Sequence, residues 1–338
     1  MSLSIVTVCM NRRQHLLATA TQVAAWPHHG EHLIVDWSSR EPLRRQELPA
    51  DPRLRLLRVE GEERWNLCRA YNFAMATAQG TVLLKLDADA WPEACFDPGA
   101  EALSLNLAAT GQEGRLPCAF GSGGGGRRGQ LLIARRLFEA VGGFHEMLEG
   151  YGFDDKDLSA RLAQVLGLEP ARIPSHWFGV LPHSDASRGG AQGTGGALVA
   201  SYGLAALRAS RLANRLQAAH TPWNANRPRS AYRRLGPELW RVDPATLPVA
   251  AVEISEEIDH ARRMTFWGCF LAIPEIFLEE LPVKLVPPPL GDQWPVRWWH
   301  RLWWRSGRRL IQLPVTLLSL SRGQLEALRA AIRLGRRR

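Results

Sequence analysis

Short apolar runs alternate with amphipathic segments along the first part of the chain. Four apolar, β-branched runs predict buried strands, at 3–9, 32–36, 54–59 and 81–86. Between them, apolar residues at helical spacing predict helices at 13–25 and 66–79, the first ending before Pro27 and the second at Gly80. A βαβ series of this kind predicts an α/β fold with a mostly parallel, Rossmann-like central sheet flanked by helices. Ligands of such sheets bind at the carboxyl ends of the strands.

The pattern changes after this first series. Residues 121–129 (GSGGGGRRG) form a glycine-rich loop without the Lys-Ser/Thr ending of a phosphate-binding P-loop, so we interpret it as a mobile loop beside a site. A strand at 130–135, a short helix at 136–141 and a helix at 158–166 are predicted next. Beyond a second glycine-rich stretch at 189–196, Pro and Trp become frequent. We therefore expect three regions: a catalytic domain at 1–188, a linker and mostly helical accessory region at 189–289, and a C-terminal segment at 290–338.

The net charge of +9 is confined to the last of these regions. Residues 290–338 hold eleven Arg and two acids, a net of +9, which leaves 1–289 neutral. Within 292–313, five Trp alternate with five Arg. Such a segment suits an anionic membrane surface, the stacking and phosphate contacts of nucleic acid, or packing on the protein body. Without a recognised nucleic-acid-binding fold, we expect no nucleic acid partner, and the other two interpretations stay open.

Composition excludes several classes of protein. With 46% hydrophobic and 22% charged residues, the chain can bury a core. Its five cysteines are widely spaced and include no CxxC pair, which argues against a disulfide framework or zinc ribbon and favours a reducing compartment. The N-terminus lacks a signal-peptide pattern, and no apolar run approaches the ~20 residues of a membrane-spanning helix. We expect a cytoplasmic protein, peripheral on the membrane if the C-terminal segment binds there.

Two acids follow the fourth predicted strand. In LLKLDADAWPE, Asp87 and Asp89 stand at i and i+2 on the loop that leaves the strand. Carboxylates placed this way can face one Mg²⁺ or Mn²⁺ and the phosphates bound to it. Asp is also common in turns, and a DxD occurs often by chance. Its place at the end of an apolar strand favours the metal site.

Three further acids crowd the start of the helix at 158–166. The residues are Asp154, Asp155 and Asp157, in GYGFDDKDL. One acid there is explained by helix capping and the helix dipole, but three are not. The glycines on either side of Tyr151 let the backbone turn closely, which leaves an aromatic ring beside the carboxylates. A carboxylate in this position can act as a general base toward a hydroxyl. His183, in LPHSDASR, is ambiguous taken alone.

In their order, these motifs resemble the GT-A glycosyltransferases, specifically family 2-like enzymes with a galactosyltransferase-type C-terminal motif. The resemblance covers about residues 3–188. It includes SIVTVCMNR, LIVDWSS, RAYNFAMATAQG and LDADAW, followed by GGFHE with GYGFDDKDL, which resemble the family's GGFDE and WGxEDxDL, and a late His-Ser pair. Tyr151 stands where the family usually has Trp, and Asp154 where it has Glu.

The resemblance implies a set of site residues. The catalytic base would be Asp155, and the acceptor would be bound by Tyr151 and Asp154. The metal, Mn²⁺ or Mg²⁺, would be held by Asp89 and His183 with Asp87 nearby. The nucleotide sugar, a UDP-sugar in most of the family, would be bound by Thr7, Asn11, Asp36, Arg69, Asn72 and Asp87.

The implied reaction is the transfer of a sugar, with inversion, from a nucleotide sugar to a hydroxyl of a saccharide or lipid-linked acceptor. The alternative is a catalytically inactive GT-A domain that binds a nucleotide sugar or glycan as a scaffold. A nucleotidyltransferase would share the strand-end acids, but it would carry a glycine-rich, basic signature after the first strand. Here that position reads Asn11-Arg12-Arg13.

Overall fold

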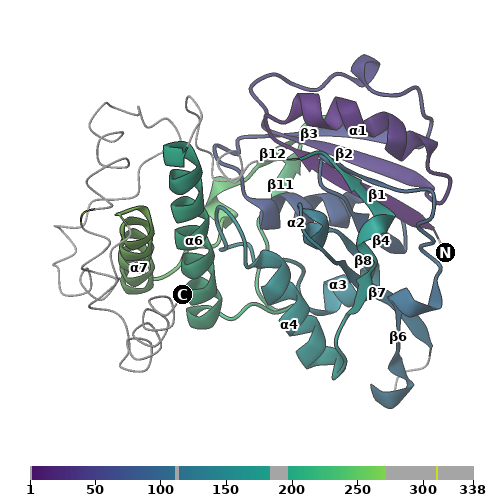
Figure 1. Cartoon of the computed structure of the whole chain (residues 1–338). Coiled ribbons are helices and arrows are strands. Elements are labelled where there is room, and N and C mark those ends of the chain that lie inside the picture. Colours follow the sequence, from purple (N-terminus) through teal and green to yellow (C-terminus); the bar gives the residue numbers. More distant parts are fainter. Residues whose placement is uncertain (1, 111–113, 183–196, 272–309, 311–338) are drawn as a thin grey trace, which may run out of the picture. The chain divides into compact units, whose positions relative to one another are not determined.

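The computed structural model describes residues 2–110, 114–182, 197–271 and 310 (Figure 1). The chain forms two compact units, Met1–His183 with Asn214–Ile254, and Ser184–Ala213 with Ser255–Arg338. The strands described below all belong to the first unit. Within the described residues, no helix combines the length and the apolar character needed to cross a bilayer.

The first unit is built on a mixed sheet with the strand order β11-β12-β3-β2-β1-β4-β8-β7-β6, to which β9 adds beside β7. The five strands β12, β3, β2, β1 and β4 run parallel, the pairs β4–β8, β8–β7, β7–β6 and β12–β11 are antiparallel, and β9 is parallel to β7. The strands are β1 Leu3–Cys9, β2 Glu31–Trp37, β3 Leu54–Glu60, β4 Val82–Lys85, β6 Ser104–Asn106, β7 Arg115–Gly121, β8 Leu131–Ala134, β9 Ala171–Ile173, β11 Tyr232–Arg234 and β12 Leu239–Val242. A separate pair joins β5 Ala90–Pro92 to β10 Phe178–Val180.

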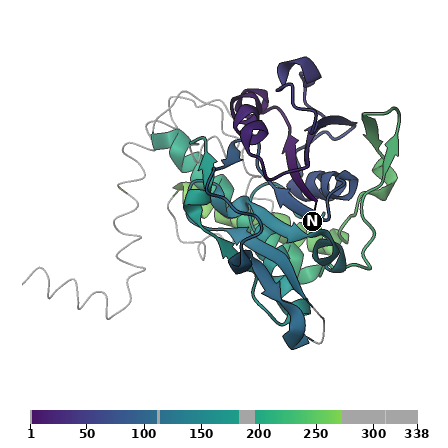
Figure 2. The same cartoon turned by 90° about the vertical axis from the view of Figure 1, so that its right-hand side faces the viewer.

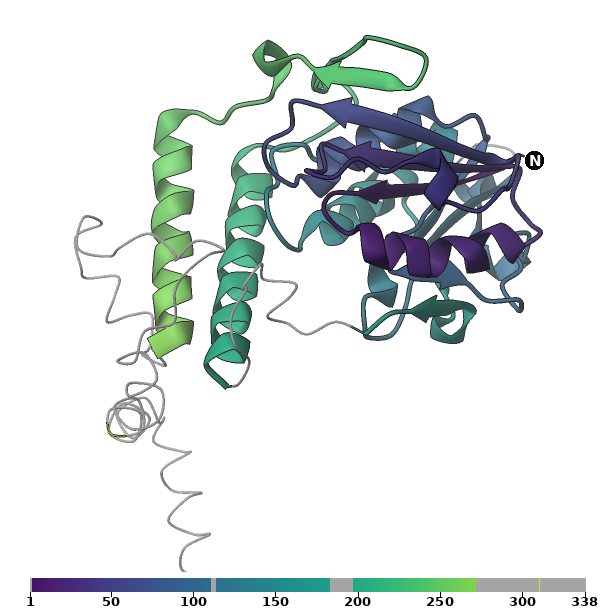
Figure 3. The ribbon, with the colours of Figure 1, turned by 90° about the horizontal axis from the view of Figure 1, so that it is seen from above.

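Helices cover both faces of the parallel strands (Figures 1 and 3). The covering helices are α1 Arg13–Ala25, α2 Leu67–Thr77, α3 Arg135–Ala140 and α4 Asp154–Leu166, and the chain also forms α6 Ala197–His220 and α7 Val252–Leu271. In β1, Val6 and Val8 face the core under α2, α3 and α4, whereas Cys9 faces the core under α1. This alternation is what the period of two in a strand requires. The predicted α/β class, with a mostly parallel sheet flanked by helices, is confirmed.

The sheet also takes strands from a region that the sequence pattern assigned elsewhere. Strands β11 and β12 lie within 189–289, predicted to be a linker and mostly helical, and the predicted catalytic domain ended at 188. Helices α6 and α7 do fall in that region. The hairpin, however, returns to pair with β3 (Leu239 opposite Arg58), and residues 214–254 join the first unit. Figure 2, turned by 90° from Figure 1, shows the blue strands β7 and β8 lying beside each other, as their antiparallel pairing requires.

One buried carboxylate fixes this return of the chain. Glu146 is 1% exposed, and it accepts hydrogen bonds from the backbone N–H (2.7 Å) and the hydroxyl (2.6 Å) of Ser230. Its other oxygen accepts from the amide of Asn72 on α2 (2.8 Å). The Trp223 indole also donates to the carbonyl of Gly142 (2.9 Å). The glutamate of the GGFHE motif therefore holds the segment before β11 against α2.

Candidate functional site

The two acids of LDADAW lie where the sequence predicts them, at the carboxyl end of β4 in the middle of the sheet. Leu86 continues the pairing with β1 through its N–H to the carbonyl of Val6 (3.0 Å). A tight turn follows, closed by the Ala90 N–H to the Asp87 carbonyl (3.0 Å). The carbonyl of Asp89 accepts from Leu181 N–H (2.8 Å), which ties this turn to the chain just before residue 183.

The carboxylate of Asp87 is held by three neighbouring side chains. Lys85 Nζ lies 2.9 Å from Oδ1, and the Tyr71 hydroxyl lies 3.3 Å from the same oxygen. Gln130 donates from Nε2 to Oδ2 (3.1 Å) and accepts from the Asp87 N–H through Oε1 (2.9 Å). The side chain of Asp87 is still 31% exposed. Asp87 is thus fixed in orientation yet open toward solvent on one side.

Burial and a neighbouring charge set the electrostatics of Asp89. Burial, followed by the nearby charge of Asp87, raises the pKa of Asp89 to about 6, against the lowering effects of Arg12 and Lys85. Two carboxylates that repel each other at a strand end accept a divalent cation readily, because the cation removes the repulsion.

The described residues supply only some of the ligands that Mg²⁺ or Mn²⁺ would need. Among the described residues, no group of three His, Cys, Asp or Glu side chains is placed to hold a metal ion. The predicted third ligand, His183, lies outside the described residues. Carboxylate oxygens are nevertheless the ligands that these hard cations prefer, with water and phosphate oxygens completing the shell. Asp89 with Asp87 beside it fits that mode of binding.

The acids at the start of α4 have different environments. Asp157 is bound by the guanidinium of Arg161 (2.6 Å), which also donates to the carbonyls of Val141 and Gly143, so Asp157 is structural. Asp155 Oδ1 is buried and has no hydrogen-bond donor among the described residues. Burial and then the charge of Asp154 raise the pKa of Asp155 to about 8, while Lys85 lowers it. Burial likewise raises the pKa of Asp154.

Gly129, at the end of the glycine-rich loop, brings these groups together. A Cβ atom added to Gly129 would lie 2.8 Å from Asp87 Oδ2, 3.6 Å from Lys85 Nζ and 3.8 Å from Asp155 Oδ2. The strand-end acid and the acid of α4 therefore face one small volume, more than sixty residues apart in sequence. The loop lies beside the site, as predicted, and its lack of a side chain at 129 leaves the room that the carboxylates occupy.

The turn before α4 has the backbone that its glycines predict. Gly150 and Gly152 have φ of 73° and 85°, in the left-handed region that favours glycine. Phe153 also has a positive φ, of 78°, which is strained for a bulky residue. Tyr151, which lies between the two glycines, is 37% exposed. Asn214 braces the turn, because its amide donates to the carbonyl of Gly152 (2.7 Å).

The loops after β1 and β2 are joined at the same edge of the sheet. Asn11 has a φ of 56° and accepts the Arg40 N–H with its side-chain oxygen (2.9 Å). Asp36 is 1% exposed and accepts from the N–H groups of Ser39 and Leu43 and from Arg58 Nη1 (2.6 Å). Asn11 is exposed to solvent here, whereas Asp36 is buried and shapes the loop through its hydrogen bonds.

The remaining predicted nucleotide-binding residues are engaged with protein groups. The Thr7 hydroxyl is bonded to His32, and both residues are buried. Arg69 forms an ion pair with Glu62 (2.8 Å). The Asn72 amide bonds the backbone of Phe144 at both its oxygen and its nitrogen. Their contact with a nucleotide stays a prediction.

Sequence reasoning missed four neighbours of Asp87. They are Lys85, Tyr71, Gln130 and Gly129. One signal was available, because a single lysine stands inside the otherwise apolar run TVLLKL. The other three come from elements whose distance to Asp87 is set only by the tertiary fold.

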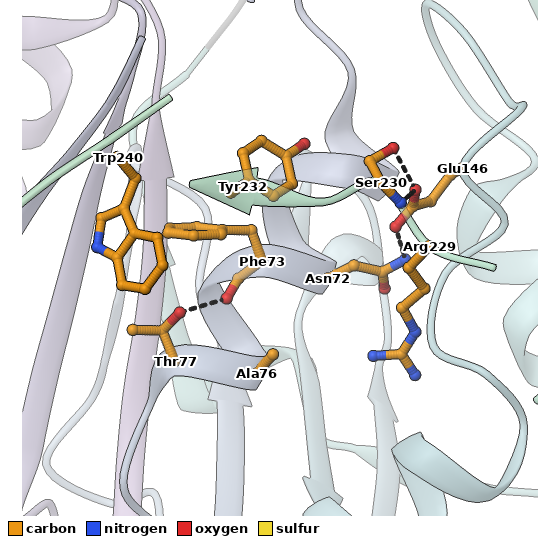
Figure 4. A pocket seen from close by; sticks show the side chains of 9 residues that line it. All are labelled: Asn72, Phe73, Ala76, Thr77, Glu146, Arg229, Ser230, Tyr232 and Trp240. Atoms are coloured by element: carbon orange, nitrogen blue, oxygen red, sulfur yellow. Dashed lines mark hydrogen bonds between the residues drawn. The ribbon is translucent and has the colours of Figure 1, made fainter. Parts of the chain in front are cut away.

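A separate cavity of about 230 Å³ lies on the other side of α2 (Figure 4). It is lined by Asn72, Phe73, Ala76, Thr77, Glu146, Arg229, Ser230, Tyr232 and Trp240. The rings of Phe73 and Tyr232 are 4.9 Å apart, and Trp240 meets Phe73 edge-on at 5.4 Å. Of the predicted site residues, Asn72 lines this cavity, and none of the site's aspartates does.

Comparison with solved structures finds several distant likenesses. Glucosyl-3-phosphoglycerate synthase of Mycobacterium tuberculosis, solved with Mn²⁺, UDP and glucosyl-3-phosphoglycerate, is 14% identical with a TM-score of 0.44, over 74% of this chain and 88% of that one. The catalytic domain of Drosophila β1,4-galactosyltransferase 7, solved with xylobiose, is 12% identical with a TM-score of 0.41, over 76% and 98%. The S. aureus protein TarS is 12% identical with a TM-score of 0.40, over 62% and 43%.

No protein-family model and no curated protein sequence matches the chain.

Proposed function

We propose that the chain is a metal-dependent, inverting glycosyltransferase that moves a sugar from a nucleotide sugar to a hydroxyl of a saccharide or lipid-linked acceptor. The observation that carries the proposal is the approach of Asp87 and Asp155 to one point beside Gly129. The acid pair Asp87 and Asp89 at the strand end suits a metal-bound diphosphate. Asp155, with an oxygen that has no hydrogen-bond donor among the described residues, suits an acceptor hydroxyl. The reaction requires both within a few ångströms of each other.

Each group then has a role. Asp89, with Asp87 beside it and His183 from outside the described residues, would hold Mn²⁺ or Mg²⁺. The cation would stabilise the negative charge on the departing nucleoside diphosphate. Asp155 would accept the proton of the acceptor hydroxyl. At the same time the hydroxyl oxygen would bond to the anomeric carbon, and the bond from that carbon to the diphosphate would break. A single displacement of this kind inverts the anomeric centre.

The flanking residues would orient the two substrates. Tyr151 presents an exposed ring on a rigid turn, which suits stacking on a sugar face, and Asp154 would hold an acceptor hydroxyl. On the donor side, Asn11 and the loop built on Asp36 would receive the nucleotide. The roles of Thr7, Arg69 and Asn72 are those implied by the family resemblance. UDP-sugars are the first donors to test.

The test is a panel of nucleotide sugars, each scored for Mn²⁺-dependent thermal stabilisation and for release of nucleoside diphosphate. We expect one donor to raise the melting temperature with Mn²⁺ and to lose that effect in Asp89→Asn. Release of diphosphate should then depend on Asp155. Stabilisation without any hydrolysis or transfer across a panel of acceptors would favour the inactive binding module instead. If no nucleotide sugar stabilises the chain, the proposal is wrong.

The basic C-terminal segment would place the enzyme on an anionic membrane surface. Residues 290–338 lie outside the described residues except for Leu310, so this proposal rests on sequence. Sedimentation with phosphatidylglycerol vesicles, with and without 290–338, would test it. Salt-sensitive binding that requires the segment is expected, and failure of the full chain to bind would exclude a cytoplasmic-face membrane location.

A further inference from the structure

Lys85 is buried in a place where an apolar residue would be expected. It is 0% exposed, and its neighbours in β4 are Val82, Leu83 and Leu84, all within the core. The strand lies between β1 and β8 in the middle of the sheet. Burying an ammonium there is costly unless it is fully paired, so its presence calls for an explanation beyond packing.

The ammonium joins three parts of the site. It donates to Asp87 Oδ1 at 2.9 Å and to the carbonyl of Gly129, and it lies 4.6 Å from the centre of the Tyr71 ring. The charges of Asp155 and Asp154 act on it as well as that of Asp87. One side chain thus links the strand-end acid, the glycine-rich loop and the acids of α4.

The composition of the chain makes this lysine more informative. Lysines number three among the 42 basic residues, at 85, 156 and 284, so arginine is used almost everywhere else. A guanidinium is planar and broad, whereas an ammonium is a compact point charge. The space between Tyr71, Asp87 and Gly129 suits the compact cation.

We propose that Lys85 is a positioning residue of the proposed transferase, whose ammonium fixes Asp87 and the 121–130 loop in the arrangement that receives the donor diphosphate. Lys85 is not placed to bind a ligand directly, because its side chain is only 1% exposed. It occupies Oδ1 of Asp87, and Gln130 occupies Oδ2, so Asp87 is held in one orientation, while Asp89 would be the acid that holds the cation. The inference rests on the proposed function for its kinetic part only.

The first arm of the experiment needs no substrate. Hydrogen exchange of the full chain would follow the loop amides of Arg127, Gly129 and Gln130, whose hydrogen bonds lie within 124–130. Lys85→Met keeps the length and suits the core, and we expect it to speed exchange of these amides about tenfold, since a hydrogen bond to a charged group is lost. Lys156→Met, an exposed lysine on α4, is the matched control and should leave them unchanged. Unaltered exchange in Lys85→Met would overturn the link to the loop.

The second arm measures transfer with the donor that the nucleotide-sugar panel identifies. Lys85→Met and Lys85→Arg should each lower kcat/KM about 100-fold, mainly through a higher donor KM, because a misplaced diphosphate site weakens binding and alignment. Lys85→Ala should be rescued several-fold by added propylammonium and not by propan-1-ol, which has the same shape without the charge. Equal rescue by the alcohol, or full activity in Lys85→Arg, would overturn the proposal. If the wild-type chain transfers nothing, the proposed function fails, and the exchange arm still decides whether Lys85 fixes the loop.

Discussion

Asp87 and Gln130 exchange two hydrogen bonds across the site, from the Asp87 N–H to Gln130 Oε1 (2.9 Å) and from Gln130 Nε2 to Asp87 Oδ2 (3.1 Å). Gln130 is fully buried directly before β8, at the end of the glycine-rich loop. The pair therefore sets the distance between the end of β4 and the end of that loop. Any change that moves the loop also moves the acid that we place beside the donor.

Gly129→Ala should disturb the site without unfolding the protein. Its Cβ would lie 2.8 Å from Asp87 Oδ2, so either the carboxylate or the loop must move. We expect diphosphate release from the donor to fall about 100-fold, as displacements near 1 Å at a reacting centre cost that much. Gly124→Ala is the control in the same loop, because a Cβ there meets nothing within 4 Å. Equal activity of the two variants would show that the room at 129 is not required.

Asp155→Asn should abolish transfer and keep nucleotide binding. The amide has the shape of the carboxylate but cannot accept a proton, and a general base contributes about 10²–10⁴-fold to rate. The measurement is transfer rate together with Mn²⁺-dependent thermal stabilisation by the donor. A mutant that transfers at the wild-type rate would exclude Asp155 as the base. A mutant that loses donor stabilisation would place Asp155 in donor binding instead.

The same substitution should change how stability depends on pH. The folded state raises the pKa of Asp155 from 3.8 to about 8, first through burial and then through Asp154. Between these values the folded protein holds a proton that the unfolded chain has released, so this group's contribution to stability is lost as pH rises through that window. Asp155→Asn removes the loss. We expect the free energy of unfolding of Asp155→Asn, measured by urea titration, to exceed that of the wild type by about 1–3 kcal/mol at pH 8.5. Near pH 4 the two free energies should match.

The contrast variant for that titration is Asp157→Asn. Asp157 is paired with Arg161, which also ties α4 to the carbonyls of Val141 and Gly143. Its removal should lower the midpoint at both pH values. A pH-independent difference between Asp155→Asn and the wild type would contradict the raised pKa.

Much of this architecture could be predicted from the sequence, because its signals are local. The run LSIVTVC is buried at every position and forms β1 as expected, and the acids of LDADAW fall directly after β4. The glycines at 150 and 152 have the positive φ that their flanking of Tyr151 suggested. Period, turn chemistry and strand ends are properties of neighbouring residues, so a sequence reports them.

Contacts between distant segments could not be predicted in the same way. Nothing near Ser230 indicates that it pairs with Glu146, so the return of β11 and β12 to the sheet was missed. In the sequence, Gln130 is only the first residue of the strand predicted at 130–135, and its contact with Asp87 depends on the tertiary fold. The approach of Asp155 to the DxD acids came from the family resemblance, and the bare spacing of the residues could not supply it.

Glu146→Gln should loosen the part of the sheet that the sequence did not foresee. Glu146 accepts on one oxygen from Ser230 and on the other from the Asn72 amide, so all its partners are donors. A glutamine must turn its own NH₂ toward one of these donors, which leaves two buried donors facing each other. The loss should be about 1–3 kcal/mol in free energy of unfolding, measured by urea titration. Ser230→Ala removes the hydroxyl and keeps the backbone N–H, so its loss should be smaller. Limited proteolysis within 221–250 should be faster in Glu146→Gln than in Ser230→Ala or the wild type. Equal cleavage of all three would show that this carboxylate does not hold the hairpin on the sheet.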